Sequence, residues 1–114
     1  MSILPTIFAD VNNTDLYQKA DERWGKDKQI MMLVEETGEM LAKISQFNRG
    51  RVTLEELVEE MVDTMMMIDQ VFYLLQVPKE MRMDILQKKM KKFRMQVEGV
   101  SKQSISEAKA KESR

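Results

Sequence analysis

The sequence contains neither cysteine nor histidine among its 114 residues. The absence of cysteine excludes disulfide bonds and thiolate metal sites, and it is compatible with a reducing compartment. The absence of histidine excludes the usual zinc sites and the Glu-x-x-His pairs of helical di-iron centres. A metal site in this chain must therefore use oxygen ligands, and such a donor set favours Mg²⁺, with Mn²⁺ as a substitute.

Proline and glycine are also scarce, with two and four copies, while 43% of residues are hydrophobic and 32% are charged. This composition is typical of a soluble, mostly helical protein. The formal net charge of −1 provides no global field for attracting nucleic acid or an anionic membrane. Apolar runs such as Met65 to Ile68 are too short to span a membrane, and we expect no secretory signal. We expect a cytoplasmic protein without nucleic-acid or membrane partners.

Hydrophobic periodicity divides the chain into four helical segments after an irregular lead-in over residues 1–13. Thr14 is a candidate N-cap for a short helix that Gly25 ends. Thr53 and Glu56 have the spacing of a capping box, which predicts the start of the third helix, and Pro78 suits the start of the fourth. We expect helices at about residues 14–24, 26–47, 53–77 and 78–97.

These segments predict an all-α fold, a four-helix bundle-like domain whose core is two long antiparallel helices. The domain is expected to cover residues 1–97, and residues 98–114 are expected to form a charged, disordered tail. A domain of this size buries only about two-thirds of the surface that its unfolded chain exposes. We therefore expect the protein to oligomerise.

A short acidic segment occurs twice, first at residues 33–39 and again 24 positions later at residues 57–63. Helix periodicity places residues i and i+3 on one face. The first segment then presents Glu36 and Glu39 on one flank of its apolar stripe, and the second presents Glu60 and Asp63 in the same angular positions. If the two helices pack antiparallel through their stripes, the four carboxylates converge.

Four converging carboxylates at the edge of buried surface would repel one another and raise their pKa values. A hard dication accepting their oxygens would remove that penalty. The alternative is a solvated acidic helix face with i,i+4 lysine partners. Glu35 and Glu59 lie further from the stripe and are weaker candidates for metal ligands.

Five further residues are candidates for the same site. Gln29 and Lys43 lie two turns before and two turns after Glu36 on the same flank, although Lys43 is equally suited to pair with Glu39. Trp24 is a candidate for stacking on a base, or alternatively a core residue. Asp69 is expected to hold a lysine or extend the metal site. Lys88 belongs to a basic segment that is suited to contacting phosphates.

The pattern Glu35-Glu36-x-x-Glu39 followed by Glu60-x-x-Asp63 resembles the EExxE…ExxD signature of the MazG-like all-α nucleoside triphosphate pyrophosphohydrolases. This family is related to the dimeric dUTPases. The resemblance covers about residues 16–93, and it includes the opening in which Trp24-Gly25 and then Gln29 precede the acidic helix.

The resemblance implies that Glu36, Glu39, Glu60 and Asp63 bind Mg²⁺ in a helical bundle that forms a homodimer or homotetramer. It implies hydrolysis of a nucleoside triphosphate between the α- and β-phosphates, which gives a monophosphate and pyrophosphate. Glu35 or Glu36 is then the expected general base, because no histidine is present. Trp24, Gln29, Lys43 and Lys88 are the expected substrate-binding residues, and housecleaning of damaged nucleotides is one role for the reaction.

Two other interpretations remain open at the level of the sequence. The chain is alternatively a non-catalytic helical interaction module whose acidic seam binds a cation or a basic partner. It is also compatible with a related pyrophosphatase that acts on dUTP or phosphoribosyl-ATP. The residues that recognise the base vary across the family, so the base cannot be inferred from the motif.

Overall fold

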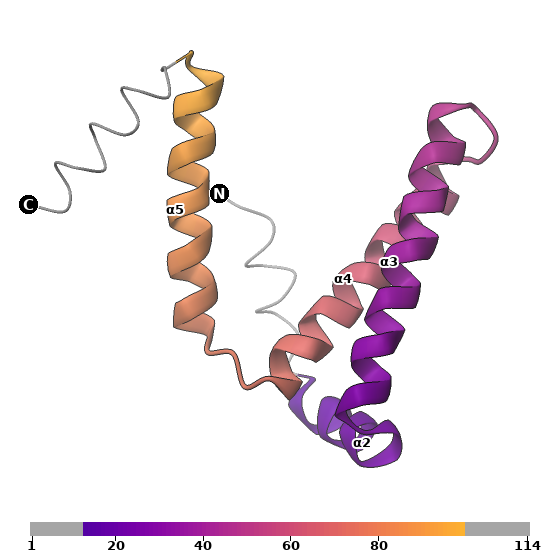
Figure 1. The fold of residues 1–114 in the computed structure, drawn as a ribbon, viewed down its shortest axis with the longest axis vertical. Coiled ribbons are helices and arrows are strands. Elements are labelled where there is room, and N and C mark those ends of the chain that lie inside the picture. The colour runs from indigo at the N-terminus through magenta and orange to yellow at the C-terminus, as the bar shows by residue number, and fades with distance from the viewer. Residues whose placement is uncertain (1–12, 100–114) are drawn as a thin grey trace, which may run out of the picture. The chain divides into compact units, whose positions relative to one another are not determined.

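The computed structural model describes residues 13–99, and in that range it contains four α-helices and no strand (Figure 1). This confirms the all-α class. The helices are α2 (Thr14–Trp24), α3 (Lys26–Asn48), α4 (Leu54–Leu74) and α5 (Lys79–Val97). The chain divides into two compact units, one ending at Gln76 and the other beginning at Val77, so α5 belongs to the second unit. The expectations for residues 1–12 and 100–114 lie outside the described residues.

Gly25 separates α2 from α3 because its backbone adopts φ 78° and ψ 168°. Only glycine adopts this combination readily, since a Cβ atom would clash with the backbone. The expected N-cap of α2 is wrong by one residue. Asn13 occupies that position, because its carbonyl oxygen accepts the first helical hydrogen bond from Tyr17 N at 2.8 Å.

The predicted start of α4 at Thr53 is confirmed. Glu56 N donates to Thr53 Oγ1 at 3.1 Å, and the Thr53 hydroxyl donates in turn to Glu56 Oε1 at 3.2 Å. In this cap the Glu56 carboxylate therefore accepts a hydrogen bond from the Thr53 hydroxyl. The other predicted helix start is at Pro78, which is the N-cap of α5 and has φ −67°. A proline suits this place because it has no N–H to leave unpaired.

The core of the first unit is the antiparallel pair of α3 and α4, which lie side by side and are joined by a short turn (Figure 1). Lys43 pairs with Glu56 near that turn, and Thr64 contacts Glu36 about two helical turns further away. The short helix α2 packs against both long helices. The buried side chains come mostly from α4: Leu57, Thr64, Met67, Val71 and Leu74.

Many apolar side chains of the predicted stripes are exposed in this structure. Val34 and Leu41 on α3 retain 56% and 61% of their accessible surface, and Leu54 on α4 retains 63%. None of the described residues of α5 is buried. The apolar stripes of α3 and α4 are therefore wider than the part of each helix that is buried within the first unit. Within residues 13–99, no helix combines the length and the apolar character needed to cross a membrane.

Candidate metal centre

Three of the predicted carboxylates meet between α3 and α4. Glu36 comes from α3, while Glu60 and Asp63 come from successive turns of α4. Each offers one oxygen atom, and these three atoms all lie within 4.8 Å of one another. The two residues of α4 share a face because they are three positions apart. We call Glu36, Glu60 and Asp63 the carboxylate triad.

A buried threonine fixes the two helices at the level of the triad. Thr64 follows Asp63 on α4 and is only 4% exposed. Its Oγ1 lies 3.0 Å from the carbonyl oxygen of Glu60 and 3.3 Å from the carbonyl oxygen of Glu36. The first contact is the common bond from a helical threonine to residue i−4. The second crosses to α3, so one hydroxyl links the backbones that carry two triad members.

The triad is electrostatically strained without a cation. Partial burial raises the pKa of Glu36 above its ordinary value of 4.5, and the neighbouring charges of Glu39, Asp63, Glu60 and Glu35 raise it further. One carboxylate oxygen of Glu36 and one of Glu60 are shielded from solvent and have no hydrogen-bond partner in the described part of the chain. Buried acceptors of this kind are costly unless they are paired. A hard cation would satisfy them.

Glu39 and Glu35 are exposed on α3 and are not part of the triad. Glu39 still acts on the triad through its charge, as the second cause of the raised pKa of Glu36. The structure thus brings together three of the four predicted metal ligands. Whether Glu39 joins them around an ion stays a prediction.

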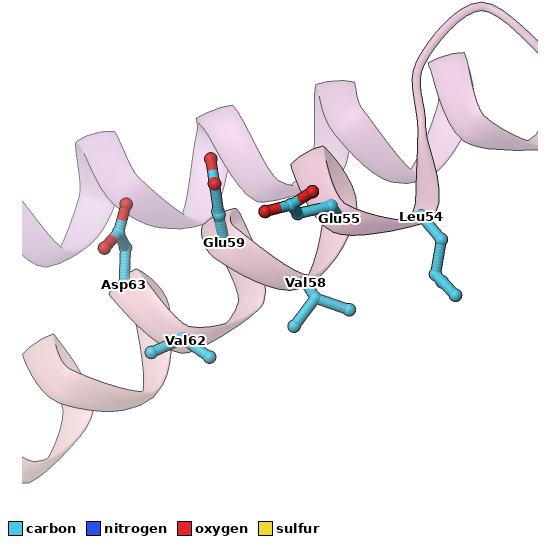
Figure 2. Close-up of a pocket in the computed structure, with 6 residues that line it drawn as sticks. All are labelled: Leu54, Glu55, Val58, Glu59, Val62 and Asp63. Atoms are coloured by element: carbon cyan, nitrogen blue, oxygen red, sulfur yellow. The ribbon is translucent and has the colours of Figure 1, made fainter.

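Asp63 also borders a hollow along α4. Figure 2 shows Glu55, Glu59 and Asp63 in a row on one side of the helix. Three apolar side chains lie on the other side: Leu54, Val58 and Val62. Asp63 therefore belongs both to the triad, which lies in the seam where α3 and α4 meet, and to the acidic edge of an apolar surface on α4.

The predicted substrate-binding residues of the first unit have different surroundings. Lys43 lies 3.8 Å from Glu56 Oε2, so its ion pair is with α4. Gln29 is only 1% exposed, and its Nε2 donates to the carbonyl oxygen of Gly25 at 3.2 Å. Trp24 is 38% exposed, with the Arg23 guanidinium 5.7 Å from its ring centroid.

Lys88, the remaining candidate, lies in the second unit. It pairs with Asp84 one turn earlier on α5 at 3.0 Å, and both side chains are well exposed. Its predicted role toward phosphates stays a prediction.

Asp69 pairs with Tyr17 where the sequence predicts a lysine or the metal site, and it is not a member of the triad. The Tyr17 hydroxyl donates to Asp69 Oδ2 at 2.6 Å, and burial together with this carboxylate raises the pKa of Tyr17 to about 12. The rings of Tyr17 and Tyr73 lie 5.8 Å apart. These contacts fasten α2 to α4. The two residues of the hydrogen bond are 52 positions apart, so no local periodicity could have paired them.

Comparison with known proteins adds no relative: no family model matches the chain, and no curated protein or solved structure matches it. The resemblance to the MazG-like family therefore rests on the acidic motif and its helical setting.

Proposed function

We propose that the protein is a Mg²⁺-dependent nucleoside triphosphate pyrophosphohydrolase. The observation that carries the proposal is the carboxylate triad, because two of its members have a shielded oxygen without a hydrogen-bond partner in the described residues. An all-oxygen, acidic donor set at the edge of a helical seam fits a hard dication such as Mg²⁺ or Mn²⁺. The acidic motif supports the reaction by its resemblance to the MazG-like family.

In this proposal Glu36, Glu60 and Asp63 hold the dication, with Glu39 completing the set. When bound, the ion neutralises negative charge on the triphosphate. Glu35 or Glu36 accepts a proton from the attacking water, whose oxygen bonds to phosphorus as the bridging P–O bond breaks. The products are a nucleoside monophosphate and pyrophosphate.

Lys43 is the candidate cation for the phosphates in the first unit. Its side chain is 31% exposed, and 3.8 Å is a long separation for an ion pair. Exposed pairs of this kind contribute little stability, so Lys43 can exchange Glu56 for a phosphate at small cost. Lys88 on α5 is a second candidate, and Trp24 is a candidate to stack on the base.

We further propose that the working form is a homodimer or homotetramer in the cytoplasm, with the helices completing a four-helix bundle. The exposed apolar side chains on α3, α4 and α5 support this, because large apolar patches on soluble domains mark interaction surfaces. Sedimentation of the full chain would show the assembly.

The experiment that tests the activity is pyrophosphate release from a panel of canonical and modified nucleoside triphosphates with Mg²⁺ or Mn²⁺. The panel includes dUTP and phosphoribosyl-ATP, and it would reveal whether damaged nucleotides are preferred. Asp63→Asn should lower the rate by about 100-fold or more, since metal-held charge stabilisation amounts to several kcal/mol. Glu59→Gln, an exposed neighbour outside the triad, is the matched control. Parental activity in a folded Asp63→Asn protein would refute the site.

A second candidate is a non-catalytic interaction module, and the hollow beside α4 favours it. Leu54, Val58 and Val62 form an apolar strip beside acidic side chains, which suits a basic, apolar-faced partner (Figure 2). Thermal unfolding with Mg²⁺ and a non-hydrolysable nucleotide separates the two candidates. An enzyme should be stabilised in a concentration-dependent manner, whereas an interaction module should not respond to the nucleotide.

A further inference from the structure

Gln70 on α4 has a side-chain acceptor that nothing in the described part of the chain satisfies. Its Oε1 atom is shielded from solvent and accepts no hydrogen bond from residues 13–99, although the residue as a whole is only partly buried. Native proteins rarely leave such a group unpaired, and each case calls for an explanation. A donor supplied by a ligand would satisfy this oxygen.

The position of Gln70 relates it to the carboxylate triad. Asp63 and Gln70 are seven positions apart, which places them on the same helical face about 10.5 Å apart along the axis. Because α3 and α4 are antiparallel, Lys43 lies on the other side of the triad, toward the turn. The seam therefore runs from a cation, through three carboxylates, to an amide. Gln29 of α3 does not donate to Gln70 Oε1; its Nε2 donates to the carbonyl oxygen of Gly25.

The helix α2 packs against α4 at the level of Gln70. Asp69 and Tyr73 lie one position before and three positions after Gln70, and both contact Tyr17 of α2. This packing holds α2 against the turns of α4 on either side of Gln70. At the opposite end of the seam, the side chains of Lys43 and Glu56 remain partly exposed.

We propose that a nucleotide bound at the triad lies along this seam, with its phosphates toward Lys43 and its base at Gln70, which reads the base edge. This inference rests on the proposed function. An amide carries both a donor and an acceptor, and base edges carry complementary groups. A ring N–H or amino group of the base donates to Gln70 Oε1. Seven residues of helix match the span of a nucleoside from its 5′ phosphate to the far edge of its base.

The test is Gln70→Met in the full chain, which keeps the length of the side chain and removes the amide. We would measure kcat/KM for pyrophosphate release from ATP, GTP, CTP, UTP and their deoxy forms with Mg²⁺. For the preferred base, kcat/KM should fall about 10-fold or more, since a site built to hydrogen-bond a substrate discriminates strongly. For the poor substrates it should change little, so the preference collapses. Gln18→Met, an exposed glutamine on α2, should keep the parental preference.

Thermal unfolding distinguishes this role from a structural one. Because Gln70→Met removes an unpaired buried acceptor, the variant should melt at the parental temperature or above it. An unchanged base preference would overturn the inference, whether or not the variant is less stable than the parent. Gln70→Glu, which keeps an acceptor and removes the donors, should shift the preference toward bases that donate. Absence of pyrophosphate release from every nucleotide by the parental protein would overturn the proposed function, and this inference with it.

Discussion

Thr64 on α4 donates its hydroxyl hydrogen toward the carbonyl oxygen of Glu36 on α3, at 3.3 Å. Because the same hydroxyl lies 3.0 Å from the carbonyl oxygen of Glu60, a single side chain sets the spacing between the two helices that carry the triad. The hydroxyl contacts no carboxylate oxygen in these bonds. Thr64 therefore acts on the site by setting the register and the separation of α3 and α4.

Thr64→Val should therefore weaken metal binding more than it weakens the fold. Loss of one hydrogen bond lowers the free energy of unfolding by about 1 kcal/mol. Affinity for Mn²⁺ should fall roughly 10-fold, in line with other groups that orient metal ligands. Paramagnetic titration with Mn²⁺ and urea unfolding measure the two effects. Thr64→Ser keeps the hydroxyl and should restore the affinity. If Val and Ser variants bind Mn²⁺ equally, the threonine is only a packing residue.

Glu36→Gln should stabilise the metal-free protein while abolishing its response to Mg²⁺. The pKa of Glu36 is raised, so the stability contributed by its protonated form is complete below the ordinary value of 4.5 and is lost as the pH rises through the raised value. At pH 7 the carboxylate thus destabilises the fold, and glutamine removes that charge. The advantage of the variant should shrink as the pH falls toward 4.5. Thermal unfolding between pH 4 and pH 8, without metal, measures this.

Tyr17→Phe should loosen the attachment of α2 and change how stability depends on alkaline pH. Tyr17 keeps its proton in the folded state up to a pKa of about 12, above the ordinary value of 10.0. Its stabilising contribution is then complete below pH 10 and declines as the pH rises toward 12. Below pH 10 the variant should lose about 1 kcal/mol of unfolding free energy, because the hydroxyl bonds a carboxylate at a partly exposed position.

The measurement for Tyr17 is urea unfolding of both proteins from pH 8 to pH 11.5. The difference in unfolding free energy between parent and variant should be constant up to about pH 10 and then decrease. Tyr73→Phe is the control, since Tyr73 contributes its ring to the same contact. A difference that grows with pH would contradict the assignment of the hydrogen bond.

Gly38→Ala should stabilise the first unit. Gly38 lies in the interior of α3, and an added Cβ atom would meet no atom within 4 Å. Alanine in place of an exposed helical glycine contributes about 0.5–1 kcal/mol. Urea unfolding of the two proteins measures the gain. A loss of stability accompanied by a smaller assembly would mean that another copy covers this face.

Local signals in the sequence predicted the helices and part of the site. Gly25 and the Thr53 cap determine helix ends through contacts with near neighbours, so they can be recognised without tertiary structure. The pairing of Glu60 with Asp63 follows from helix periodicity in the same way.

Contacts between helices could not be predicted in this way. The rotation of α3 against α4 decides that Glu36 joins the triad while Glu39 stays exposed, and a helical wheel leaves that angle undetermined. The sequence does not predict Tyr17 as a partner of Asp69, because the two residues lie on different helices. The unpaired oxygen of Gln70 is likewise a property of packing, since glutamine on a helix normally reaches water.

The backbone at Gly25 has a consequence for how this sequence can diverge. Its conformation, φ 78° and ψ 168°, is closed to residues with a side chain, yet a Cβ atom there would meet no neighbour within 4 Å. The need for glycine at this position therefore comes from the direction of the chain and not from any contact with neighbouring side chains. Through that direction Gly25 determines where α2 places Tyr17. In related sequences this glycine should persist even where the surrounding surface residues have all been replaced.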